Sequence, residues 1–189
     1  MAYFKFWGLA VRADEGERGT MKRFLMGMVA TVAALCIAAL LIMRLGLVAV
    51  NADQPPPSLE ARLMPLALHA SVARHAPPLT NPVQPTEENL RAGIDTYRQM
   101  CARCHSLPGG EPSIYGSAFY PPAPQLSGGL PQYTDAELFW TIKHGIRNTG
   151  MLAWGAMLSD EDIWQIVAVL KRSGDLPPAV ESEWAGRGK

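Results

Sequence analysis

Five consecutive residues, Cys101-Ala-Arg-Cys104-His105, carry the clearest chemistry in this sequence. The spacing Cys-x-x-Cys-His is the attachment signature for a c-type haem. Two thiols can add across the two vinyl groups of one porphyrin, and the imidazole that follows comes up beneath the iron as a ligand. The second ring nitrogen is then left to be oriented by a backbone carbonyl. The motif predicts one covalently attached haem c, held by Cys101 and Cys104, with His105 on the iron.

Three other interpretations of these residues fit the sequence less well. A thioredoxin-like redox pair needs a βαβ context, and no alternation of strand and helix patterns is visible. A structural zinc site needs further ligands near the cysteines, but the only other cysteine, Cys36, lies far away in an apolar run. A plain disulfide between Cys101 and Cys104 is the simplest remaining alternative.

Haem iron in an electron carrier usually has a second axial ligand, and a thioether sulfur raises its reduction potential. Met151 lies in a glycine-flanked stretch, residues 148–155, between two predicted helices. Met157 follows six residues later and is the rival ligand. Spacing favours Met151, since such loops carry functional groups, but leaves Met157 open.

Three helical patterns are placed to position these residues. Thr86 is a predicted N-cap, followed by two glutamates in the first turn and by a helix that runs into Cys101. Thr134 and Glu137 form a capping box that opens a second helix, and Ser159 caps the last one. The residues expected on their buried faces are Leu90, Ile94, Tyr97, Leu138, Phe139, Ile142, Ile163, Ile166, Val167 and Leu170.

Between the first two helices, residues 106–133 are rich in glycine and proline and show no periodicity. A long loop inside a compact domain is expected to have a function, which here would be to wrap one edge of the porphyrin. The apolar groups available for this are Tyr115, Phe119, Tyr120 and Leu126.

The N-terminal third is organised for export. Residues 1–23 are predicted to be a short disordered cytoplasmic segment, with Met21 as an alternative start. Residues 24–50 are a predicted transmembrane anchor or uncleaved signal, because residues 24–43 contain 20 residues without a charge. The sequence Val50-Asn-Ala52 resembles a signal cleavage site, so removal of the span stays open. Lys22 and Arg23 place the N-terminus in the cytoplasm and the remainder outside it.

Residues 51–85 contain eight prolines, a density that disfavours long helices and central strands. We predict a semi-rigid, extended linker, in which His69 and His75 are solvated. The haem domain then spans residues 86–178, and residues 179–189 are expected to be a polar, frayed tail.

The net charge of the chain says little about which kinds of partner it binds. The chain has a net charge of zero by count, so nothing argues for a nucleic-acid partner. Residues 86–178 hold ten acidic and seven basic side chains, an excess too small to define the charge of a redox partner.

The chain resembles the class I monohaem c-type cytochromes of bacteria, including membrane-anchored members. The matching stretches are Cys101-Ala-Arg-Cys104-His105, Pro124-Gln-Leu126-Ser-Gly128, Gly150-Met151-Leu-Ala-Trp154-Gly and Leu158-Ser-Asp-Glu-Asp-Ile-Trp164.

This resemblance implies an all-α domain wrapped around one haem, with the first and last helices crossing near Gly93. It implies that the Pro124 carbonyl holds the His105 ring N–H and that Met151 is the axial ligand. Leu126 and Trp154 are implied to contact the haem, with Trp140 as a further candidate.

Two residues depart from the family pattern. Leu152 replaces the usual proline after the methionine. Val169 stands where the last helix often has an aromatic side chain, which weakens the helix crossing unless Trp164 compensates.

The residues and the resemblance lead to three hypotheses. The first is a membrane-tethered electron carrier, not itself an enzyme, with its haem domain on the periplasmic side of a bacterial inner membrane and redox proteins as donor and acceptor. The second is the cytochrome c subunit of an exported oxidoreductase, such as a dehydrogenase, or of a respiratory complex. The third is a haem sensor or small haem enzyme with an open iron site.

Overall fold

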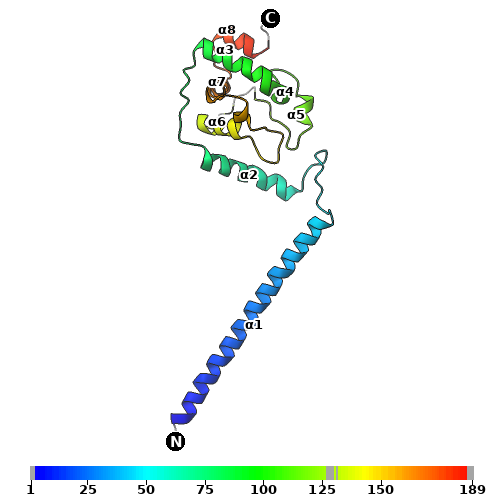
Figure 1. Cartoon of the computed structure of the whole chain (residues 1–189), viewed down its shortest axis with the longest axis vertical. Helices are drawn as coiled ribbons and strands as arrows, with labels where there is room; N and C mark the ends of the chain where they lie inside the picture. Colours follow the sequence, from blue (N-terminus) through cyan, green and yellow to red (C-terminus); the bar gives the residue numbers. More distant parts are fainter. Residues whose placement is uncertain (1–2, 127–129, 131, 187–189) are drawn as a thin grey trace. The chain divides into compact units, whose positions relative to one another are not determined.

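The computed structural model describes residues 3–126, 130 and 132–186. These residues form helices and no strand, which confirms the predicted all-α class (Figure 1). Gly128, one of the residues that carry the family resemblance, lies outside the described residues. The chain divides into two compact units, one ending at Asn51 and the other beginning at Ala52. In chain order the elements are α1 (Tyr3–Arg44), α2 (Ser58–His75), α3 (Glu87–Thr96), the π-helix η1 (Tyr97–Cys101), α4 (Ala102–His105), α5 (Ile114–Ser117), α6 (Asp135–His144), the 3₁₀-helix η2 (Trp154–Ala156), α7 (Asp160–Lys171) and α8 (Pro178–Trp184).

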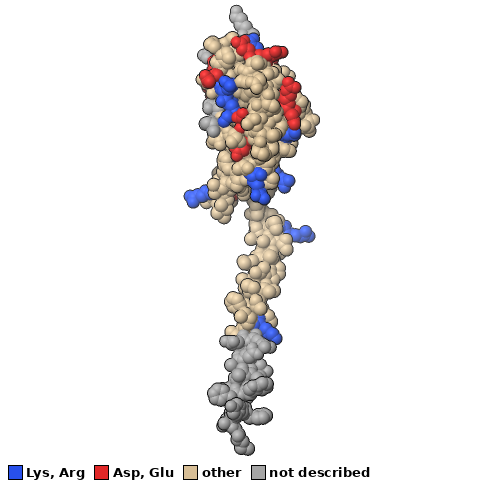
Figure 2. Space-filling model, turned by 90° about the vertical axis from the view of Figure 1, so that its left-hand side faces the viewer, with Lys and Arg blue, Asp and Glu red and all other residues tan. Residues whose placement is uncertain are grey.

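The first unit is built on α1, a helix of 42 residues. Its segment Gly19–Arg44 has a mean hydropathy of 2.6 and is long and apolar enough to cross a membrane. Figure 2 shows an uncharged surface along the coloured part of this helix, with basic side chains at both ends of that part. Those basic residues are Lys22 and Arg23 before the apolar run and Arg44 after it.

One expectation for this unit was wrong. The segment predicted to be disordered is helical from Tyr3 onward, because the chain has no proline before residue 55 and a nucleated helix propagates at little cost. The helix ends at Arg44, inside the predicted membrane segment of residues 24–50. Gly46, at φ +66°, reverses the chain there. The amide of Leu47 donates to Ile42 at 3.1 Å, and that of Gly46 to Met43 at 3.2 Å, which is a Schellman C-cap.

The prediction of an extended linker was also wrong, because residues 58–75 form α2. Seven of the eight prolines flank this helix, three before it and four after it, so only Pro65 lies inside. Pro65 removes one backbone hydrogen bond, and tertiary packing offsets this loss. Val72 is 1% exposed where α2 lies against α6.

His69 and His75 remain exposed, as expected, but they are not free of contacts. The His69 ring stacks on Tyr133 with centroids 5.3 Å apart, and the His75 ring stacks on Trp140 at 5.9 Å. Both histidines therefore help to hold α2 on the domain.

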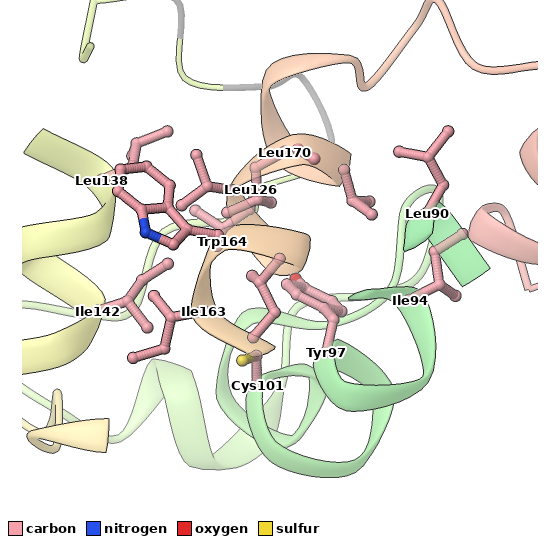
Figure 3. Packing of buried hydrophobic residues seen from close by; sticks show 14 of the residues in the cluster. Leu90, Ile94, Tyr97, Cys101, Leu126, Leu138, Ile142, Ile163, Trp164 and Leu170 are labelled. Atoms are coloured by element: carbon pink, nitrogen blue, oxygen red, sulfur yellow. The ribbon is translucent and has the colours of Figure 1, made fainter. Parts of the chain in front are cut away.

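The core of the second unit is centred on α7. This helix lies between α3 and α6, with α8 beyond α3 and α2 beyond α6 (Figure 1). Residues 163–170 are all buried, so α7 is covered on every side. Trp164 stacks on Phe139 of α6 at 4.1 Å, and Figure 3 shows the apolar side chains that converge here.

The crossing of α3 and α7 near Gly93 is confirmed. A Cβ atom at Gly93 would lie 2.7 Å from the carbonyl carbon of Gln165 and 3.0 Å from a methyl group of Val169. A larger residue would separate the two helices. The predicted N-caps Thr86, Thr134 and Ser159 are confirmed as well, each accepting a hydrogen bond from the third residue of its helix.

The expected frayed tail is instead α8, in which Val180 and Trp184 are 0% and 1% exposed. Pro177 and Pro178 begin this helix, since proline is tolerated in a first turn. Trp184 packs edge-on against Tyr97 at 4.8 Å, and its Nε1 donates to Ser173 Oγ at 3.1 Å. Trp184 of α8 thus makes an aromatic contact with Tyr97, directly after α3. Val169 of α7, by contrast, cannot supply an aromatic contact there.

Two arginines tie α8 to the chain that leads into the Cys-x-x-Cys-His segment. Arg98 donates to the carbonyl of Glu183, and Arg91 pairs with the Glu183 carboxylate at 3.2 Å. Helix α8 is therefore an integral part of the domain.

We predict that Trp184→Ala lowers the free energy of unfolding by about 3–5 kcal/mol, because it removes a buried ring and leaves a cavity beside Tyr97. Guanidinium denaturation of the haem-loaded protein, followed by circular dichroism, measures this. Ser182→Ala, an exposed change in the same helix, is the matched control. A loss below about 1 kcal/mol would show that α8 is peripheral.

Candidate haem site

The two cysteines of the motif lie on one continuous helical path. Helix α3 passes through the π-helical turn η1, which ends at Cys101, and continues as α4 to His105. Such π turns are frequent at functional sites. Cys101 is 9% exposed, and its sulfur lies at the margin of the apolar cluster (Figure 3). Cys104, one turn on, is half-buried.

Both thiols are free in this structure, and the chemistry around Cys101 does not favour the alternatives to haem. Burial, with a smaller effect of Cys104, raises the pKa of the Cys101 thiol to about 12. A redox-active Cys-x-x-Cys pair has a lowered thiol pKa instead. Among the described residues, no group of three or more His, Cys, Asp or Glu side chains could hold a metal ion. The zinc interpretation therefore lacks ligands.

The imidazole of His105 is held in one orientation. Its Nδ1 lies 2.7 Å from the carbonyl oxygen of Pro124. A carbonyl can only accept a hydrogen bond, so Nδ1 must carry a proton, and in the neutral imidazole Nε2 is then the nitrogen that keeps its lone pair. An imidazole tied in this way is typical of a metal ligand whose other nitrogen faces the metal.

The residue after His105 ends the helix in a fixed place. Ser106 has φ +60°, a conformation that costs a non-glycine residue free energy and needs support. The Tyr97 hydroxyl donates to the backbone carbonyl of Ser106 at 2.9 Å. The Ser106 hydroxyl in turn donates to the backbone carbonyl of Glu111, also at 2.9 Å. Burial raises the pKa of Tyr97 well above its usual value, which keeps this donor protonated.

The loop that supplies Pro124 folds back on α4 through a close contact at Gly116. A Cβ atom there would meet the carbonyl group of Cys104, with the carbon 3.1 Å away. The Gly116 carbonyl accepts from the amide of Ala123 at 2.9 Å, next to Pro124. Only glycine allows α5 to approach so closely, and the Pro124 carbonyl reaches His105 as a result.

The predicted methionine ligands lie in different surroundings. Met151 is half-buried and packs against the core cluster, whereas Met157 is 58% exposed. The turn before Met151 is fixed by Thr149, whose hydroxyl accepts from the Met151 amide at 3.1 Å. A Cβ atom at Gly150 would lie 2.6 Å from the Phe119 ring, so the methionine turn packs on the loop that begins at His105.

The other predicted haem contacts divide into two groups. Leu126 is 8% exposed and belongs to the core cluster, and Trp154 packs against the same cluster. Trp140 instead lies on the outer side of α6, between the rings of His75 and His144. It is thus turned toward α2, and its contact with the haem stays a prediction.

The residues gathered here fit a c-type haem. Two thiols one turn apart, an imidazole with a free Nε2, a half-buried thioether and apolar neighbours are the groups that attach, ligate and shield it. Sequence reasoning missed the supporting roles of Tyr97 and Ser106. Their signal was faint, since a tyrosine on a helical face is ordinarily read as core.

Comparison with known proteins agrees with this geometry. Residues 88–169 match the family model described as "Cytochrome C oxidase, cbb3-type, subunit III", and no curated protein matches the chain. The matched range includes the helical path to His105, the Pro124 loop, the methionine turn and most of α7. Residues 88–169 of this chain therefore correspond to a c-type cytochrome domain, of the kind that carries electrons on a haem.

Proposed function

We propose that this chain is a membrane-tethered one-electron carrier, in which Cys101 and Cys104 attach one haem c and His105 and Met151 are its axial ligands. The observation that carries the proposal is the hydrogen bond from His105 Nδ1 to the Pro124 carbonyl, 2.7 Å long. In the neutral imidazole this hydrogen bond leaves the Nε2 lone pair available, on the residue that directly follows Cys104. When bound, haem supplies the ferrous–ferric couple.

The residues around the site suit electron transfer without substrate binding. His105 is fixed in orientation, and a thioether from Met151 would close the opposite side, so no coordination position stays open. The buried Leu126 and the half-buried Trp154 keep water away, and a dry site with a sulfur ligand has a raised reduction potential. With both ligands held by packed turns, little needs to reorganise when the charge changes.

Carbon monoxide binding tests the choice of ligand. We expect the visible spectrum of the reduced protein to be unchanged by carbon monoxide, because both axial positions are filled. Met151→Ala should form the carbon monoxide adduct, and the exposed Met157→Ala is the matched control that should not. Prompt binding by the unaltered protein would favour the sensor or enzyme hypothesis. An adduct only with Met157→Ala would make Met157 the ligand.

Replacement of the two cysteines that are proposed to attach the haem tests the role of haem in folding. We expect Cys101→Ser combined with Cys104→Ser to leave residues 52–189 unfolded, because a small domain with long loops has a modest core of its own and loses the apolar contacts of the cofactor. NMR chemical-shift dispersion of the detergent-solubilised chain measures this, with Cys36→Ser as the control that keeps both thioether bonds. A well-dispersed spectrum of the double variant would contradict the expectation.

We further propose that α1 is a retained anchor in a bacterial inner membrane and that the haem domain lies on its periplasmic side. The support is an apolar helix of sufficient length with Lys22 and Arg23 before it, the arrangement that keeps an N-terminus in the cytoplasm. The Schellman cap at Gly46 ends the helix well before the cleavage-like sequence at Ala52.

A second candidate function, the cytochrome subunit of a respiratory or dehydrogenase complex, is favoured by the family match alone. Extraction of the membrane fraction with a mild detergent separates the two. For a free carrier we expect the chain to be recovered alone, with a mass that includes α1. Co-purification with a catalytic subunit would support the complex, and a mass that lacks residues 1–52 would remove the anchor.

A further inference from the structure

Helix α2 has apolar side chains on two opposite faces, and the domain covers only one of them. On the covered face, Val72 is 1% exposed. On the other, Leu59, Leu63 and Leu66 are 68%, 47% and 66% exposed. Their spacing of four and three residues places them in one stripe. Leu63 and Val72 are nine residues apart, which is two and a half helical turns, so the stripe points away from the domain.

The charges on α2 fit a lipid surface better than a second protein core. The helix carries Arg62 beside the stripe and Arg74 near its far end, with Glu60 as its one acidic residue. A helix whose apolar stripe is bordered by arginines is typical of segments that lie in a membrane interface, where the long side chains reach the anionic headgroups.

The segment between α1 and α2 also exposes apolar side chains. Helix α1 ends at Arg44, and Leu59 follows fifteen residues later. The connecting segment cannot exceed about 50 Å even when fully extended. It carries further exposed apolar side chains: Leu45, Leu47, Val48 and Val50. If α1 spans the membrane, the stripe is confined close to the bilayer, and a weak interfacial affinity is then sufficient for binding.

We propose that the stripe Leu59–Leu63–Leu66 of α2 binds the outer surface of the bilayer and holds the cytochrome domain in one orientation to it. The proposal rests on the proposed anchor. Because α2 is fixed to α6 through Val72, His69 and His75, binding of α2 would orient the domain as a whole. The haem would then approach redox partners from a fixed side instead of rotating freely on a tether.

Site-directed spin labelling of the full haem-loaded chain in nanodiscs of phosphatidylcholine and anionic phosphatidylglycerol tests this. In a Cys36→Ser background, a nitroxide is attached in separate samples through Leu63→Cys, Leu66→Cys or Ala61→Cys. Ala61 is exposed, lies two residues from Leu63 and faces the opposite side, so it is the matched control. Collision with oxygen, which partitions into lipid, is compared with collision with a water-soluble nickel chelate in the reduced protein.

We expect the ratio of oxygen to nickel-chelate accessibility to be severalfold higher at Leu63 and Leu66 than at Ala61. Equal access of the chelate to all three labels would overturn the proposal. Labels at Leu63 and Leu66 that are shielded from both reagents would also overturn it, and would point to a protein contact or a second copy of the chain. The mass of the purified chain shows whether α1 has been lost before any label is read. A wrong proposal for the anchor is therefore distinguishable from a wrong proposal for membrane binding by the stripe.

Discussion

The close approach of α3 and α7 at Gly93 is the constraint on which the rest of the domain depends. The Gln165 backbone occupies the space that a side chain at Gly93 would need. Because the two helices touch there, the C-terminal end of α3 is driven against the apolar face of α7, and Tyr97 and Cys101 become part of the core. The attachment segment is thus the continuation of a helix that packing has already fixed.

From that crossing, each proposed ligand is placed by a short chain of contacts. Tyr97 supports the strained Ser106, and Ser106 ends the helix directly after His105. Gly116 brings the loop back against Cys104, which allows the Pro124 carbonyl to reach the imidazole. The Phe119 ring of the same loop then packs on Gly150, beside Met151. A loop that looked irregular in sequence is therefore held at three points.

Two helices outside the range that matches the family model, residues 88–169, change how the domain can be used. Helix α8 covers α3 and supplies the aromatic contact to Tyr97, so the domain extends to its C-terminal helix. Helix α2 covers α6 and offers a second apolar face to its surroundings. With α1 as the proposed anchor, such a helix would suit the domain to work at a membrane surface, where diffusion to a partner is restricted to two dimensions.

The sequence by itself determined the features that depend on local chemistry. The motif at Cys101 to His105 predicted a c-type haem, because thioether attachment needs that spacing, and the family match agrees with a haem c. The N-caps at Thr86, Thr134 and Ser159, the apolar faces of α6 and α7 and the apolar run of α1 could be predicted, because each is set within a few residues.

Only the tertiary structure decided the roles of residues whose surroundings come from distant parts of the chain. Proline density predicted an extended segment at residues 58–75, but burial of Val72 stabilises a helix there. Trp140 could have faced the haem or the solvent, and docking of α2 turned it toward His75. Trp184, in a stretch read as a frayed tail, is buried because Tyr97 lies opposite. Periodicity and composition report on near neighbours, whereas these side chains are governed by contacts between residues far apart in sequence.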